Sequence, residues 1–187
     1  MLIKPKKSLG QNFLIDKNII QYIADIAEIN ENDTLLEIGP GTGNLTKELI
    51  LKRPKKIIVV EKDKNLSKEL KNNFDKQIQI FNEDILKLDE EILSKEKMIF
   101  FGNLPYNISS QILIKWIKLK NLNSICKKFI LMFQKEVADR IVSKFNSQNY
   151  SRISILSSWR LEIKKLKEIS PNSFYPKPKV KSCLLLL

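Results

Sequence analysis

The sequence predicts an α/β domain in which a mostly parallel sheet is covered by helices on both faces. Short apolar runs alternate along the chain with segments of helical length, which is the rhythm of a βαβ fold. The run at residues 57–60 is continuously apolar, as expected of a strand buried on both faces of a parallel sheet. The length of 187 residues suits one domain, so we expect residues 1–187 to fold as a single unit.

The individual elements follow from the same pattern. Strands are expected, in chain order, at residues 34–38, 57–60, 78–81, 98–101, 129–133, 152–161 and 180–187. Helices are expected to begin at Ser109-Ser110 and to lie near residues 135–142. The proline-rich residues 171–178 are expected to form a rigid connector, or a pocket wall, before the last strand.

The amino-acid composition favours a nucleic-acid partner and argues against a metal site, a disulfide framework and a membrane span. The excess of 33 Lys and Arg over 21 Asp and Glu favours a polyanion such as nucleic acid, although a lysine-rich proteome would give part of the same excess. Histidine is absent, and the cysteines Cys126 and Cys183 lie far apart, so we expect no metal site and no disulfide framework. Without a signal peptide or an apolar run of membrane-spanning length, we expect a cytoplasmic protein with no membrane partner.

Three of the five glycines, Gly39, Gly41 and Gly43, follow directly after the strand predicted at residues 34–38. Glycine permits a sharp turn from strand to helix and lets a ligand approach the amides of the helix N-terminus. A dinucleotide-binding turn would need glycine in place of Asn44, so the spacing favours S-adenosylmethionine over NAD. A turn without a ligand would account for one or two of these glycines, but three within five residues favour a nucleotide-type cofactor.

Two acidic residues follow the next two predicted strands, at the sheet edge where open α/β folds bind ligands. Glu61 is placed to accept hydrogen bonds from the hydroxyls of a ribose, and Asp84 to accept one from an adenine amine. Taken alone, Glu61 is also consistent with a surface carboxylate and Asp84 with a helix cap.

The loop Asn103-Leu104-Pro105-Tyr106 follows the fourth predicted strand and reaches the same edge. The Asn103 side-chain oxygen and the Leu104 carbonyl are candidates to bind the two hydrogens of an aromatic amine and to favour a pyramidal nitrogen, without a general base. Pro105 fixes the loop, and Tyr106 offers a ring on which an extruded base stacks. An ordinary β-turn remains the alternative for an isolated loop of this kind. Phe174 is a candidate for the opposite wall of the base pocket, or an ordinary core aromatic.

Five stretches of the chain, taken together, resemble the rRNA adenine N6,N6-dimethyltransferases. They are KSLGQNFL (7–14), EIGPGTGNLT (37–46), GNLPYNIS (102–109), QKEVA (134–138) and FYPKPKV (174–180). The resemblance implies a Rossmann-like class I S-adenosylmethionine-dependent methyltransferase fold with an antiparallel final strand. It also implies that the family's usual C-terminal helical domain is absent from this chain.

By the same resemblance, we expect the chain to methylate N6 of adjacent adenines near the 3′ end of small-subunit (16S) rRNA, as a monomer acting on the pre-30S particle in ribosome biogenesis. The cofactor residues it implies are Asn12, Leu14, Gly39, Gly41, Glu61, Asp84 and Asn103, with an N-terminal arm of residues 1–15 closing over the cofactor. Asn103, Tyr106 and Phe174 would form the adenine pocket.

Three other functions remain open at this point. The related large-subunit rRNA dimethyltransferases of the macrolide-resistance type share much of this framework. A non-catalytic RNA-binding assembly factor would use the same basic surface. A methyltransferase acting on DNA adenine or on a small molecule would meet the same problem of an unreactive amine.

Overall fold

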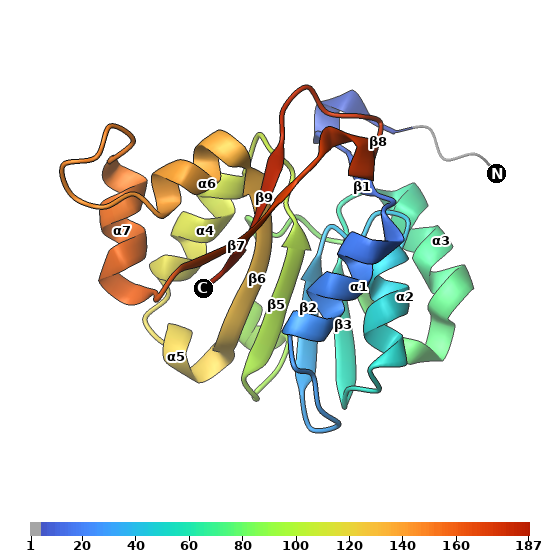
Figure 1. Cartoon of the computed structure of the whole chain (residues 1–187). Helices are drawn as coiled ribbons and strands as arrows, with labels where there is room; N and C mark the ends of the chain where they lie inside the picture. The colour runs from blue at the N-terminus through green and yellow to red at the C-terminus, as the bar shows by residue number, and fades with distance from the viewer. Residues whose placement is uncertain (1–4) are drawn as a thin grey trace.

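The computed structural model describes residues 5–187 and contains an open seven-stranded sheet flanked by helices (Figure 1). The strands of this sheet are β2 (Thr34–Ile38), β3 (Lys56–Val60), β4 (Gln79–Phe81), β5 (Met98–Asn103), β6 (Cys126–Gln134), β7 (Lys164–Ile169) and β9 (Ser182–Leu186). Their order across the sheet is β4-β3-β2-β5-β6-β9-β7. The first five in this order are parallel, and β9 is antiparallel to both β6 and β7. The predicted mostly parallel sheet with an antiparallel final strand is confirmed.

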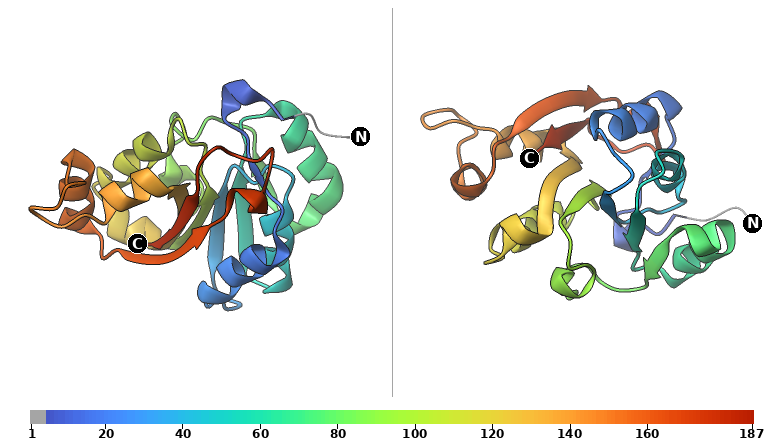
Figure 2. Two further views of the ribbon diagram at one scale, coloured as in Figure 1. Left: turned by 45° about the horizontal axis from the view of Figure 1, so that its top comes forward. Right: turned by 90° about the horizontal axis from the view of Figure 1, so that it is seen from below.

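The helices cover both faces of the sheet (Figure 2). They are α1 (Lys17–Ile26), α2 (Asn44–Leu51), α3 (Lys64–Phe74), α4 (Ser109–Ile117), α5 (Leu122–Ile125), α6 (Lys135–Ile141) and α7 (Arg152–Arg160). Alternate strand residues point to opposite faces, so Leu35 packs with α1 and α2 while Leu36 packs with α4. The face beneath α4 includes a cluster of buried aromatic rings, Phe100, Trp116 and Phe129, with centroids 4.9–5.2 Å apart.

The topology places a ligand site between β2 and β5. From β2 the chain moves outward to β3 and β4, and it then crosses back to β5 on the other side of β2. The loops that follow β2 and β5 therefore diverge at the carboxyl edge of the sheet, where open α/β folds bind their ligands. A separate two-stranded sheet, β1 (Phe13–Leu14) with β8 (Phe174–Tyr175), lies at this same end (Figure 1).

The strand predicted at residues 152–161 is wrong, because these residues form the helix α7. A capping box starts the helix, in which the Ser151 N–H donates to the Ser154 hydroxyl at 3.0 Å. Ser154 and Ser157 are fully buried one turn apart, so the buried face of α7 is made of serines that the apolar pattern could not identify. No helix in the described part of the chain is long and apolar enough to cross a membrane.

Candidate active site

The loop after β2 is shaped by three glycines with positive φ. Gly39, Gly41 and Gly43 have φ of 62°, 58° and 79°, a region that other residues rarely adopt. A Cβ on Gly41 would lie 2.7 Å from the Phe13 ring, and one on Gly43 would lie 2.5 Å from the Phe74 ring. A Cβ on Gly39 would meet no atom within 4 Å. Two of these glycines thus serve close packing, whereas Gly39 leaves its backbone open to a ligand.

This difference predicts distinct effects of alanine at Gly39 and Gly41. Gly39→Ala should lower the free energy of unfolding by about 1–2 kcal/mol, the cost of a left-handed conformation with a Cβ. Gly41→Ala should lower it further, because the new Cβ also collides with Phe13. Chemical denaturation of both variants without cofactor measures the difference, and equal losses would contradict the packing role of Gly41.

Glu61 lies at the end of β3 and reaches back to the glycine turn. Its Oε2 accepts the Gly41 N–H at 3.2 Å, and its Oε1 accepts the Asp63 N–H at 2.8 Å. Burial raises the pKa of Glu61, although both backbone bonds oppose the change. The side chain is 6% exposed and borders the cavity described below, so Glu61 is both a brace for the turn and a candidate acceptor for a ribose.

Both carboxylate oxygens of Asp84, the second predicted acidic residue, have partners in the protein. Its Oδ1 accepts the Leu86 N–H at 3.0 Å, and its Oδ2 pairs with Lys62 at 2.9 Å. Burial alone would raise the pKa of Asp84, but the bonds from Lys62 and Leu86 outweigh it and the pKa lies below its usual value. The carboxylate therefore stays ionised and available to an amine.

The N-terminal arm crosses this site and is bonded to the start of α3 and to the start of α2. Gln11 donates to the Asp63 carboxylate at 3.1 Å, and Lys6 pairs with the same carboxylate at 2.9 Å. The Asn44 side chain donates to the Leu14 carbonyl at 2.8 Å. Residues 1–4 of the predicted arm lie outside the described residues. From residue 5 onward, the arm lies against the glycine turn and the start of α3.

Asn103 joins the arm to the loop after β5. Its Nδ2 donates to the Asn12 carbonyl at 2.6 Å, across 91 residues of sequence. This bond fixes the orientation of the amide, because only the nitrogen can donate to a carbonyl. The Oδ1 atom of Asn103 therefore remains able to accept a hydrogen bond.

Seven predicted cofactor residues border a single cavity at the carboxyl edge of the sheet. They are Asn12, Leu14, Gly39, Gly41, Glu61, Asp84 and Asn103. Of the other residues predicted to be catalytic, Pro105 also borders it, whereas Leu104, Tyr106 and Phe174 do not. Leu104 is buried in the core, and Tyr106 is partly exposed with its hydroxyl 2.7 Å from the Ser182 Oγ. Phe174 packs in the core beneath α1 and is 3% exposed.

The cavity also includes residues that the sequence pattern did not single out. Phe13 covers Gly41, and Asn44 holds the arm through the Leu14 carbonyl. Glu37, on β2, is 2% exposed and accepts a hydrogen bond from the Thr46 hydroxyl at 2.6 Å. An acidic residue inside an otherwise apolar strand is the signal that could have identified Glu37. Among residues 5–187, no group of three or more Cys, Asp or Glu side chains is arranged to hold a metal ion.

Comparison with known proteins identifies the family. The model of the family described as "Ribosomal RNA adenine dimethylase" matches residues 3–187. The chain belongs to this family. The predicted family and methyltransferase fold are thus confirmed, and the family is one of S-adenosylmethionine-dependent enzymes.

Individual relatives agree with this placement. The "Ribosomal RNA small subunit methyltransferase A" of Pelagibacter ubique is 55% identical over the whole chain, which spans 71% of that relative. The protein of the same description from Wolbachia sp. subsp. Brugia malayi is 42% identical over 98% of the chain and 70% of its own length.

Two solved structures share the fold at recognisable sequence identity. A dimethyladenosine transferase from Plasmodium falciparum superposes with a TM-score of 0.83 and 32% identity, over 94% of this chain and 62% of that one. A 23S rRNA methyltransferase superposes with a TM-score of 0.77 and 29% sequence identity, over 94% of this chain and 68% of that one. The proteins that this chain resembles thus include ones described as small-subunit rRNA methyltransferases and one described as a 23S rRNA methyltransferase.

Proposed function

We propose that this protein transfers methyl groups from S-adenosylmethionine to N6 of adjacent adenines near the 3′ end of small-subunit rRNA, giving N6,N6-dimethyladenosine. The observation that carries the proposal is the position of Asn103, which lines the same cavity as the glycine turn and whose amide orientation is fixed by its bond to the Asn12 carbonyl. The relatives described as small-subunit methyltransferases, at 55% and 42% identity, support this substrate. The pre-30S particle in the cytoplasm is the proposed setting, and a monomer the proposed form.

The residues around the cavity suit S-adenosylmethionine. The open backbone at Gly39 suits the close approach of a ligand's polar chain, and the buried carboxylate of Glu61 suits a ribose. The ionised Asp84 suits an adenine amine. When bound, this cofactor supplies an electrophilic methyl group on a sulfonium. The contacts of Asn12, Gln11 and Leu14 support an arm that closes over it.

Asn103 acts on the attacking nitrogen. The N6 lone pair of adenine is delocalised into the ring, so the amine must be held in a pyramidal geometry before it attacks a methyl carbon. The Asn103 Oδ1 accepts one N6 hydrogen and the Leu104 carbonyl accepts the other, which places the lone pair toward the cofactor. The chain has no histidine, and this mechanism needs no side chain to remove a proton before attack.

Stacking of the target base is assigned to Tyr106 and Phe174. A base on an aromatic ring gains about 1–3 kcal/mol, which offsets the cost of extruding it. Tyr106 is partly exposed and is available for such a contact. Phe174 is covered in this structure, so its role requires the β1–β8 pair to shift when RNA binds.

The net charge of +12 predicts that RNA affinity depends strongly on salt. Each phosphate neutralised by Lys or Arg releases counterions, with a slope of log affinity against log salt of about −0.7 per contact on single strands. Affinity for unmodified small-subunit RNA should therefore fall steeply between 50 and 200 mM salt, by about 300-fold for six contacts, as filter binding or anisotropy would measure. A flat response would point to a small-molecule substrate.

The deciding experiment is radiolabelled methyl transfer to unmodified small subunits and, in parallel, to naked large-subunit RNA. Nuclease digestion and mass detection of the product then give the methylation number. Dimethyladenosine in the small-subunit product supports the proposal. Label only in large-subunit RNA would replace it by the second candidate, which the likeness to the 23S rRNA methyltransferase favours.

A further inference from the structure

Tyr106 is held at its hydroxyl by a residue from a distant strand. Its Oη lies 2.7 Å from the Oγ of Ser182, and the two residues are 76 positions apart. Ser182 is fully buried and is the first residue of β9. A ring whose backbone follows Pro105 and whose hydroxyl is bonded to a strand is restrained at both ends, which limits rotation about both of its side-chain torsions.

Ser182 itself occupies a rigid position. It pairs with Gln134 at the end of β6 on one side and with Ile169 at the end of β7 on the other. The backbone N–H of Lys135 donates to the Lys181 carbonyl at 2.9 Å, immediately before Ser182. The start of β9 is therefore fixed by backbone bonds on both edges, even though β7 is the edge strand of the sheet.

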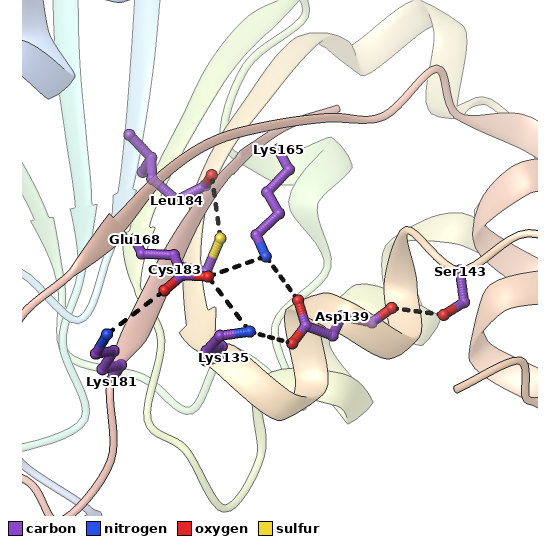
Figure 3. Close-up of polar contacts among 8 residues, drawn as sticks. All are labelled: Lys135, Asp139, Ser143, Lys165, Glu168, Lys181, Cys183 and Leu184. Carbon is purple, nitrogen blue, oxygen red and sulfur yellow. Dashed lines mark hydrogen bonds and ion pairs between the residues drawn. The ribbon is translucent and has the colours of Figure 1, made fainter. Parts of the chain in front are cut away.

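Five charged side chains reinforce this end of β9, and we call them the α6–β7–β9 ion cluster (Figure 3). Lys135 pairs with Asp139 at 2.6 Å and with Glu168 at 3.3 Å. Lys165 bridges the same two carboxylates at 2.7 and 3.3 Å, and Lys181 approaches Glu168 at 3.8 Å. Each pair is partly exposed and contributes little by itself, but the cluster connects α6, β7 and the residue preceding Ser182.

We infer that Ser182 is a positioning residue for Tyr106, holding the ring in the orientation that stacks the target adenine. The inference rests on the methyl transfer proposed above. Its physical basis is that a small misplacement of a reacting nitrogen lowers the rate of transfer more than it lowers binding. A serine that served only packing would need no partner, as Ser157 illustrates: it is equally buried, and its Oγ has no hydrogen-bond partner among the described residues.

Removing either hydroxyl should have the same effect. Tyr106→Phe and Ser182→Ala should each lower kcat for methyl transfer to small subunits about 3- to 10-fold, the usual range for one hydrogen bond. The double variant should be no slower than the slower single variant. Ser182→Thr keeps a hydroxyl and should recover most of the rate. The Kd for S-adenosylmethionine, measured by calorimetry, should be unchanged in all of them.

A readout that does not depend on activity follows the ring directly. The chain has four tyrosines, so ¹³C-tyrosine labelling gives few ring signals, and Tyr106→Phe identifies the signal of Tyr106 by its loss. Ser182→Ala should shift that signal, whereas the control Ser157→Ala should leave both the signal and the rate unchanged. If Ser182→Ala does not fold, Tyr106→Phe tests the same bond from its other side.

Several outcomes would overturn the inference. These are a full rate or an unmoved Tyr106 signal in Ser182→Ala, a full rate in Tyr106→Phe, or losses that multiply in the double variant. Absence of methyl transfer by the wild-type protein would instead reject the proposed function. In that case the Tyr106 signal in Ser182→Ala still decides whether Ser182 holds the ring.

Discussion

Replacing Asn103 by alanine is expected to remove most methyl transfer while cofactor binding remains. The variant loses the Oδ1 atom that we propose accepts an N6 hydrogen in the transition state, and loss of one such preorganised group typically costs about 10²–10³ in kcat. The contacts proposed for the cofactor with the glycine turn, Glu61 and Asp84 come from other loops and should remain. Single-turnover transfer to unmodified small subunits measures the rate, and calorimetry with S-adenosylmethionine measures the binding.

Two further substitutions separate the role of the oxygen from that of the amide. Asn103→Asp keeps an oxygen acceptor but loses the Nδ2 donor to the Asn12 carbonyl, so its rate should fall between wild type and Asn103→Ala. Asn72→Ala, on an exposed position of α3, is the matched control and should be fully active. Undiminished turnover in Asn103→Ala would reject the role of Asn103.

The parallel part of the sheet was predictable because its strands are buried on both faces. The apolar runs of β2, β3 and β5 lack the 3.6-residue alternation of apolar and polar residues that marks a surface helix. The glycines after β2 mark where that strand ends. β7 escaped prediction because it is an edge strand with four charged residues among six, as suits an edge that must not pair with another chain.

The residues on the cofactor side of the cavity were predictable from short-range sequence patterns, but the long-range hydrogen bonds that hold the site together were not. Gly39, Glu61 and Asp84 each follow a predicted strand, so the topology alone brings them to one edge. The bond between Asn103 and Asn12 spans 91 residues, and that between Tyr106 and Ser182 spans 76. Such contacts depend on the folded arrangement of arm and sheet, which no local pattern specifies. Phe174 illustrates the same limit, since its burial follows from the pairing of β8 with β1.

Glu37 should make the protein less stable as the pH rises from about 4.5 to about 7. Burial raises the pKa of Glu37 from 4.5 to about 7, with the Thr46 hydrogen bond opposing the change and the negative Glu61 adding to it. The folded state thus holds this proton more tightly than the unfolded chain does. Its stabilising effect is fully present below pH 4.5 and is lost as the pH rises through the folded-state pKa, for a total of about 3 kcal/mol.

Glu37→Gln isolates this effect, because glutamine can still accept the Thr46 hydrogen bond but carries no charge. The free energy of unfolding of the variant, from urea denaturation, should exceed that of wild type by up to about 3 kcal/mol at pH 8 and should match it near pH 4.5. Glu31→Gln makes the same chemical change at an exposed position and should show no such pH-dependent gain. A difference between Glu37→Gln and wild type that stays constant from pH 4.5 to 8 would contradict the buried-carboxylate explanation. A buried carboxyl group retained on this strand at such a cost in stability, beside the glycine turn, is more readily explained by a demand of the cofactor site than by a demand of the fold.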